Sequence, residues 1–195
     1  MLESGTIVSL TNHINVMKRT CRSVLNPQAN LDLVHGSLGL INEFFELKEA
    51  VHKKDVINIK EEIGDSVWYI CCMLNGLDLT FEDLEIAAPD VFIPAGDLAA
   101  LKIAGVQHND AIAGLSDTVK AYLMYNRTYT LEHWVFLIKE VLIAISVVAK
   151  VFGITMEEIM AANKAKLEAR YPEKFSEECA NNRDLSKEHK ALVGE

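Results

Sequence analysis

The amino-acid sequence predicts an all-α protein, built as a bundle of long helices. Prolines occupy only 4 of the 195 positions, so long stretches lack the residue that breaks helices. Within these stretches, apolar residues recur at three- and four-residue spacing, the periodicity of a helix with one buried face. No segment shows the alternation of apolar and polar residues that is typical of a half-buried strand. Half of the residues are apolar, enough for one domain with a sizeable core.

Prolines, glycines and capping residues divide the chain into segments. We expect helices over about residues 7–25, 31–54, 56–75, 111–126, 131–151 and 156–170. Asn26-Pro27 should end the first helix, Gly76 the third and Tyr171-Pro172 the last. Thr80 and Asp83 predict a capped short helix. Residues 87–109 hold two prolines and two glycines and are the best candidate for a loop.

A faint internal repeat divides the predicted bundle into two halves. Residues 77–85 (LDLTFEDLE) match residues 152–160 (FGITMEEIM) at an offset of 75 positions. Two amphipathic helices followed by a capped turn would look similar without a duplication, and we favour a duplication only slightly. The expected organisation is one domain over residues 1–172, with halves at about 31–86 and 106–161, and a polar surface tail at 173–195.

Charge and composition exclude several classes of protein. The net charge of −9 argues against broad binding to nucleic acid, which needs clustered Lys and Arg. The N-terminus lacks the basic and long apolar segments of a signal peptide. The most apolar stretch, residues 141–149, is far shorter than the roughly 20 residues of a membrane span. Four cysteines without a C-x-x-C pair favour free thiols in a reducing compartment. We therefore expect a cytoplasmic protein with neither a membrane nor a nucleic-acid partner.

Two acidic motifs on consecutive predicted helices indicate a metal site. Glu43 and Glu46 in EFFE share one helix face, and Glu62 and Asp65 in EEIGD have the same spacing. Two adjacent helices can thus bring four carboxylates together, where like charges raise each pKa unless a cation intervenes. Oxygen ligands suit Mg²⁺, and the lack of histidine at ligand spacing argues against zinc and di-iron sites. The simpler interpretation is two solvated acidic pairs.

A polar face near the end of the last long helix could bind phosphate. Asn163, Lys166 and Arg170 have i, i+3, i+7 spacing and share a face. Two cations and an amide donor suit phosphate oxygens. Taken alone, basic residues that complement the helix dipole are the simpler interpretation.

Several residues beside these motifs have simpler interpretations. Trp68, Tyr69 and Met73 can stack on a base, but we expect them mainly in the core. His35 is expected to cap a helix, although it can also line a pocket. Lys164 lies off the face of Asn163, and we expect it to be exposed to solvent.

Together, these motifs resemble the all-α nucleoside triphosphate pyrophosphohydrolases of the MazG type. The resemblance is carried by GLINEFFELKEA, KEEIGDSVWYI, GLDLTFEDLE and NKAKLEARYP, over about residues 35–85 and 150–172. The family pattern is E-x-x-E followed by E-x-x-D, with N-x-x-K and R downstream. The tail YPEKFSEECANNRDLSKE resembles the ends of MazG-like proteins often found in phage genomes, which would place the protein in a host cytoplasm.

The resemblance implies that the acidic residues hold metal and activate water. About two Mg²⁺ ions, or Mn²⁺ in their place, would be bound by Glu43, Glu46, Glu62 and Asp65. The ions would hold a nucleoside triphosphate while water attacks the α-phosphorus and releases pyrophosphate and the monophosphate. Glu46 is the expected catalytic acceptor of the water's proton.

The resemblance also implies a substrate-binding role for Asn163, Lys166 and Arg170, which would contact phosphates in a homodimer or higher homo-oligomer. Two features depart from the family pattern. Phe44 and Phe45 stand where the family has small residues, which would reshape the pocket. About 75 residues interrupt the usual short spacing before the basic helix, a layout similar to that of the related dimeric dUTPases.

Three functional hypotheses follow. The first is a Mg²⁺-dependent nucleotide pyrophosphohydrolase that controls a nucleotide pool. The second is a phosphoribosyl-ATP pyrophosphohydrolase or a dUTPase-like enzyme, which shares the scaffold and the metal-binding acids. The third is a helical interaction module whose acids are surface charges. A metal-dependent rise in melting temperature would separate the enzymes from the module.

Overall fold

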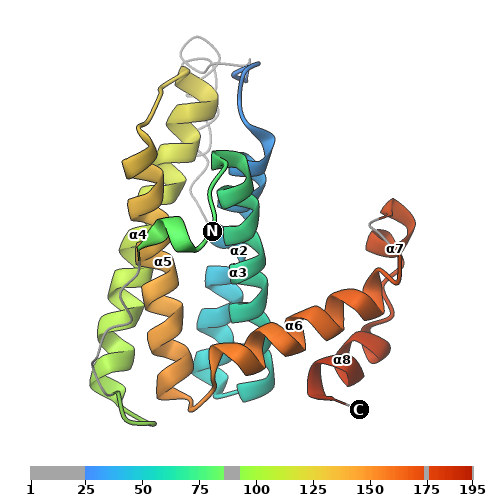
Figure 1. Ribbon diagram of the computed structural model, residues 1–195. Helices are drawn as coiled ribbons and strands as arrows, with labels where there is room; N and C mark the ends of the chain where they lie inside the picture. Colours follow the sequence, from blue (N-terminus) through green and yellow to red (C-terminus); the bar gives the residue numbers. More distant parts are fainter. Residues whose placement is uncertain (1–24, 86–92, 174–175, 195) are drawn as a thin grey trace, which may run out of the picture.

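The computed structural model describes residues 25–85, 93–173 and 176–194, which form seven α-helices, one 3-10 helix and no strand. Four long helices make the bundle in Figure 1: α2 (Leu31–Lys53), α3 (Val56–Leu77), α4 (Leu98–Tyr125) and α5 (Leu131–Val151). The 3-10 helix η1 (Glu82–Leu84) follows α3. This confirms the predicted all-α fold; the helix expected at 7–25 lies outside the described residues. No helix in the described ranges is both long and apolar enough to cross a membrane.

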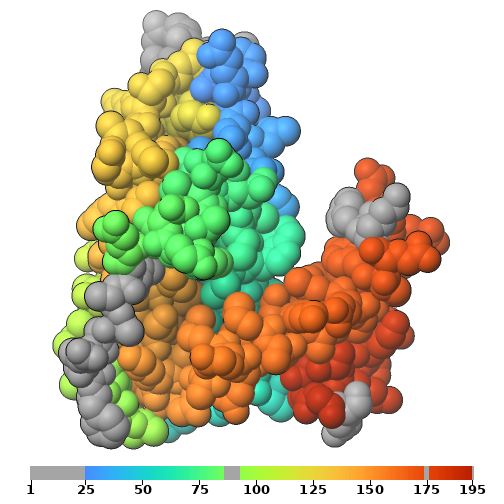
Figure 2. Space-filling view, viewed as in Figure 1, coloured from blue at the N-terminus to red at the C-terminus, as the bar shows by residue number. Residues whose placement is uncertain are grey.

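Three further helices form an arm beside the bundle. Helix α6 (Met156–Arg170) extends away from the bundle after α5. Helices α7 (Glu177–Asn181) and α8 (Leu185–Val193) lie beside the part of α6 that is farther from the bundle (Figure 1). The surface is hollowed between this arm and the bundle (Figure 2). The sequence predicts a polar tail here, but α8 packs against α6 and buries Leu192. Short helices with few apolar residues leave little periodic signal, which explains why α7 and α8 were not predicted.

Helices α2 and α3 begin at side-chain caps and end at left-handed residues. The Asn30 side chain accepts the backbone N–H groups of Asp32 and Leu33 and donates to the Gly76 carbonyl. The prediction that α3 ends at Gly76 is wrong. The helix continues through Leu77 and turns at Asp78, which adopts a left-handed φ of 57°.

The start of α4 corrects the predicted loop at 87–109. Gly96 adopts a left-handed φ of 80°, and the Asp97 side chain then caps the backbone N–H groups of Ala99 and Ala100. The following residues are mostly Ala, Leu, Lys and Ile, which favour a helix or tolerate one. Gly105 weakens the helix by about 1 kcal/mol, which is too little to break it. Residues 98–109 are therefore helical.

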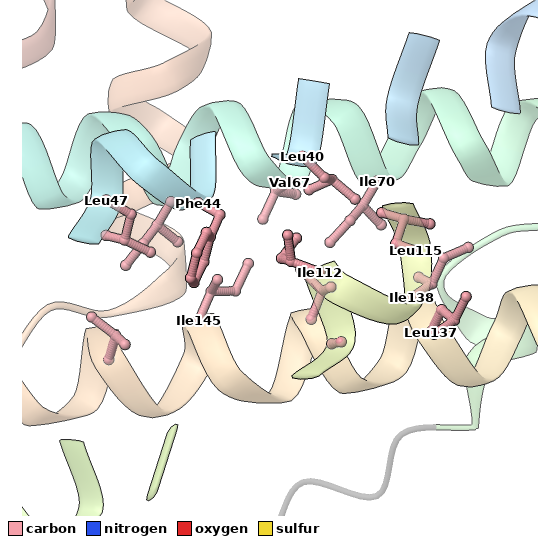
Figure 3. Packing of buried hydrophobic residues seen from close by; sticks show 14 of the residues in the cluster. Leu40, Phe44, Leu47, Val67, Ile70, Ile112, Leu115, Leu137, Ile138 and Ile145 are labelled. Atoms are coloured by element: carbon pink, nitrogen blue, oxygen red, sulfur yellow. The ribbon is translucent and has the colours of Figure 1, made fainter. Parts of the chain in front are cut away.

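The core joins all four helices of the bundle. Figure 3 shows its side chains pointing toward one another from α2, α3, α4 and α5: Leu40, Phe44, Leu47, Val67, Ile70, Ile112, Leu115, Leu137, Ile138 and Ile145. Each is at most 7% exposed, and burial of such a side chain contributes about 1.5–3 kcal/mol. This shared core fixes the spacing between α2 and α3, which carry the acidic motifs.

Candidate active site

Three of the four predicted metal-binding acids form a cluster between α2 and α3. Glu43, Glu62 and Asp65 each offer a carboxylate oxygen, and these oxygens lie within 4.8 Å of one another. The exposed fraction is 6% for Glu43 and 5% for Glu62, whereas Asp65 is partly open to solvent. The helical i, i+3 spacing places Glu62 and Asp65 on one face of α3, and the α2–α3 packing adds Glu43.

The fourth predicted ligand, Glu46, lies outside this cluster. Its side chain is exposed, and its carboxylate accepts a hydrogen bond from Asn42 Nδ2 at 2.7 Å. Glu46 nevertheless lies close enough to raise the pKa of Glu43 and Glu62 through its charge. Its assignments as a metal ligand and as the acceptor of the water's proton stay predictions.

Burial and mutual repulsion raise the pKa of the two buried acids. The pKa of Glu62 is raised by burial, then by its hydrogen bond to Glu43 and by the charge of that carboxylate. Burial also raises the pKa of Glu43, although the hydrogen bond with Glu62 opposes this shift. A cation placed among these oxygens would replace the retained proton. The donor set contains only carboxylate oxygens, which suits a hard divalent cation.

Two of the predicted phosphate-binding residues reach the same cluster from α6. Asn163 Nδ2 donates to Asp65 Oδ1 at 2.7 Å. Lys166 is 1% exposed, and its Nζ lies 2.5 Å from Asp65 Oδ2 and 3.2 Å from Glu61 Oε1. In this structure both residues bind acids, so they bring a positive charge and an amide donor to the edge of the site.

A glycine permits this close approach of α6 to α3. A Cβ atom at Gly64 would lie 2.9 Å from Asn163 Cβ, closer than such atoms pack. Gly64 stands between Glu62 and Asp65, so the EEIGD motif supplies both the acids and the surface on which α6 packs. The spacing within the motif predicted its acids, but it did not predict this packing role.

The third predicted phosphate-binding residue, Arg170, lies apart from Asp65. Its Nη2 donates to Glu188 Oε2 at 2.5 Å, and Arg183 Nη2 donates to the same oxygen at 2.7 Å. Burial alone would raise the pKa of Glu188, but its hydrogen bonds with both guanidiniums outweigh burial and lower it to about 2. Glu188 was not predicted, because nothing in its local sequence indicates a contact with α6.

The acids and the arm line one cleft of about 610 Å³. Its residues come from α2, α3 and α6 and include Glu43, Asp65, Asn163, Lys164, Arg170 and Tyr171. The cleft lies in the hollow between bundle and arm in Figure 2. A space of this size can hold a nucleotide-sized ligand, with acidic side chains on the bundle side and both basic and acidic side chains on α6.

An aromatic wall forms another side of the cleft. His35, Trp68 and Tyr69 line it and contact one another edge-on, with ring centroids 5.1–5.7 Å apart. The expectation of core positions is correct for Met73, which is buried, but wrong for Trp68, which is 39% exposed. His35 lies within α2 rather than at its cap, correcting that expectation as well. Gly39 leaves room for the Tyr69 ring, and this glycine was the signal in the sequence for the close contact.

Comparisons with known proteins give one match. Residues 36–92 match the family model described as the MazG nucleotide pyrophosphohydrolase domain, which confirms the predicted resemblance over that segment. The segment contains the clustered acids, Trp68 and Tyr69, whereas α6 lies outside it. Searches of curated proteins and of solved structures found no match. The match supports a nucleotide pyrophosphohydrolase.

Proposed function

We propose that this protein is a Mg²⁺-dependent pyrophosphohydrolase that cleaves a (deoxy)nucleoside triphosphate to the monophosphate and pyrophosphate and so controls a nucleotide pool. One observation carries the proposal: Glu43, Glu62 and Asp65 cluster together, and two of them, Glu43 and Asp65, line a nucleotide-sized cleft that α6 completes. The MazG match over the same acids supports this class of reaction.

The cluster is suited to hold the metal. Glu43, Glu62 and Asp65 would be its ligands, with Glu46 as a further ligand if its side chain turns inward. The all-oxygen donor set favours Mg²⁺, and Mn²⁺ can take its place. A bound divalent ion polarises phosphate oxygens and lowers the pKa of bound water.

The chain's own residues would orient the triphosphate and accept a proton. Asn163 and Lys166 lie against Asp65, so their donors are within reach of phosphate oxygens at the cluster. Arg170 would contact phosphate farther along the cleft. The carboxylate of Glu46 is exposed three residues beyond Glu43, and we propose it as the acceptor of the attacking water's proton.

The aromatic wall would bind the base of the nucleotide. His35, Trp68 and Tyr69 offer ring surfaces beside the acids, and stacking of a base on an aromatic side chain is worth about 1–3 kcal/mol. Stacking tolerates all bases, because each has an aromatic face.

Assembly into a homodimer or higher homo-oligomer is part of the proposal. Large apolar side chains, among them Phe45, Ile103 and Val106, are each about 60% exposed in the single chain. Size-exclusion chromatography with light scattering would measure the mass. A monomer at micromolar concentration would contradict this part and leave the proposed reaction standing.

A nucleotide panel tests the proposed reaction. Each (d)NTP and phosphoribosyl-ATP is incubated with the protein and Mg²⁺ or Mn²⁺, and pyrophosphate release is measured. We expect release from at least one (d)NTP, loss with a chelator and loss in Glu62→Gln. Glu49→Gln is a matched control, because Glu49 is an exposed acid on α2 paired with Lys53.

Three results would contradict the proposal. Full activity in Glu62→Gln would exclude the cluster as the site. Activity restricted to phosphoribosyl-ATP would select the phosphoribosyl-ATP pyrophosphohydrolase alternative. Release from no substrate, together with no rise in melting temperature at millimolar Mg²⁺, would favour the helical interaction module.

A further inference from the structure

A buried ion-pair cluster joins the end of α6 to the C-terminal helix α8. Glu188 is 4% exposed, and its carboxylate accepts hydrogen bonds from Arg170 and Arg183. Arg183 also donates from Nε, at 3.3 Å to each carboxylate oxygen. One carboxylate shared by two guanidiniums leaves a net positive charge, so the cluster still attracts an anion.

Arg170 belongs to this cluster and to the wall of the candidate active site. It lines the cleft that contains Glu43 and Asp65. Seven residues separate it from Asn163, which places it about 10 Å farther along the helix axis. Its Nε atom is buried and has no hydrogen-bond partner among the described residues. The guanidinium also lies over the ring of Tyr171, 5.9 Å from its centroid, and Tyr171 lines the same cleft.

We propose that Glu188 is a positioning residue that holds the Arg170 guanidinium at the cleft, ready for a phosphate group of the substrate; this inference rests on the proposed function. Arg170 is the last residue of α6, where Tyr171-Pro172 ends the helix. A free arginine side chain carries about 2 kcal/mol of rotamer entropy. Glu188 removes much of that freedom before substrate binds, so less is lost on binding.

Arg183 makes this arrangement compatible with anion binding. A carboxylate paired with Arg170 alone would cancel its charge, whereas Glu188 shares its charge with Arg183. Arg183 is 40% exposed and on the solvent side of the pair. The C-terminal helix, outside the segment that matches the MazG family, thus becomes part of the active site.

A double-mutant cycle tests the inference through two readouts. The first is the Kd for inorganic tripolyphosphate with Mg²⁺, measured by calorimetry, and the second is the KM and kcat for the best nucleotide. We expect Glu188→Gln to raise Kd and KM about tenfold, which is about 1.4 kcal/mol, and to leave kcat within twofold. In an Arg170→Ala background, Glu188→Gln should have no further effect, because Glu188 acts through Arg170.

Two more variants serve as controls, one for a change of charge in the same segment and one for loss of folding. Glu178→Gln removes one exposed acid from the same C-terminal segment and should change neither Kd nor KM. Glu188→Asp keeps the charge but shortens the reach and should give an intermediate loss of about threefold. If Glu188→Gln fails to keep α8 folded, as judged by circular dichroism and limited proteolysis, Glu188→Asp takes its place in the cycle.

The outcomes separate this inference from the proposed function. An unchanged tripolyphosphate Kd in the Glu188 variants overturns the inference, as does an effect that persists in the Arg170→Ala background. A loss confined to kcat overturns it too, because a positioning role predicts weaker binding. A wild-type protein that releases no pyrophosphate overturns the proposed function, while the Kd measurements still decide the role of Glu188.

Discussion

The helix pairs α2–α3 and α4–α5 belong to the same bundle, but they bury side chains of different chemical types. At the offset of 75 positions, Glu43 corresponds to Thr118 and Glu62 to Leu137. The first pair buries two carboxylates whose pKa values are raised, whereas the second buries a leucine that is 5% exposed. In the second pair, the Thr118 hydroxyl lies at a hydrogen-bonding distance of 2.9 Å from His133 Nε2.

This difference distinguishes the helix pair that carries the candidate site from the pair that mainly stabilises the fold. Buried carboxylates destabilise a helix pair unless a cation or a proton neutralises them, so packing alone does not explain the first pair. The second pair contributes mainly apolar side chains to the core, although α4 also buries His108. The first pair also has polar residues of α6 against it, because Gly64 lets Asn163 and Lys166 reach Asp65. The duplication itself stays a prediction, and the contrast does not depend on it.

The largest expected effect comes from giving the first pair the side chain of the second. Glu62→Leu removes one carboxylate from the cluster and places there the residue that α5 carries at position 137. We expect kcat/KM for pyrophosphate release to fall at least about a thousandfold, or about 4 kcal/mol of transition-state stabilisation. The rise in melting temperature with Mg²⁺ should vanish as well. Retained activity would mean that Glu62 is not part of the site.

The reverse exchange should damage stability rather than activity. Leu137→Glu buries a carboxylate at a position that is 5% exposed and packed in the hydrophobic core. We expect a loss of about 3 kcal/mol in the free energy of unfolding, measured in urea. Phe136→Glu is the matched control on the exposed side of α5 and should change stability by less than about 1 kcal/mol. Equal losses at both positions would show that burial is not the cause.

The acids of the first pair should also make the metal-free protein sensitive to pH. Their pKa is raised above the ordinary 4.5, so the folded state binds more protons than the unfolded state as pH rises above that value. Stability must then fall with rising pH across this window. Between pH 5 and pH 8 in a chelator, we expect wild type to lose about 2 kcal/mol more than Glu62→Leu. Parallel pH profiles for the two proteins would contradict the raised pKa.

The smallest expected effect lies at the hydrogen bond of the second pair. Thr118→Val keeps the shape of the side chain and removes the contact with His133. The free energy of unfolding should fall by about 1 kcal/mol, while kcat/KM stays within twofold of wild type. A large loss of activity would show that the second pair contributes to the site.

The sequence predicted the helices with strong periodicity and missed those without it. Helices α5 and α6 agree with the predicted 131–151 and 156–170, because capping residues and apolar spacing mark both ends. The start of α4 was missed because Gly105 and the prolines before it outweighed a helix-forming composition. Helices α7 and α8 are too short and polar to produce a periodic signal.

The sequence likewise predicted only part of the site's arrangement. Spacing alone identified Glu43, Glu62 and Asp65, because i, i+3 residues share a helix face wherever the helix packs. Spacing also included Glu46, which turns instead toward Asn42. The rotamer of the Glu46 side chain decides whether its carboxylate joins the cluster, and the helical period does not determine a rotamer.

The all-α class, most helix boundaries and the acidic motifs follow from residues that lie within a few positions of one another. Which of those residues meet depends on how the helices pack. Lys166 reaches Asp65 across 101 positions, and Arg170 turns to Glu188 on α8. Trp68 and Tyr69 line a cleft, and Tyr69 also packs against the core. These contacts depend on the distance and angle at which helices pack, which the shared core and Gly64 set.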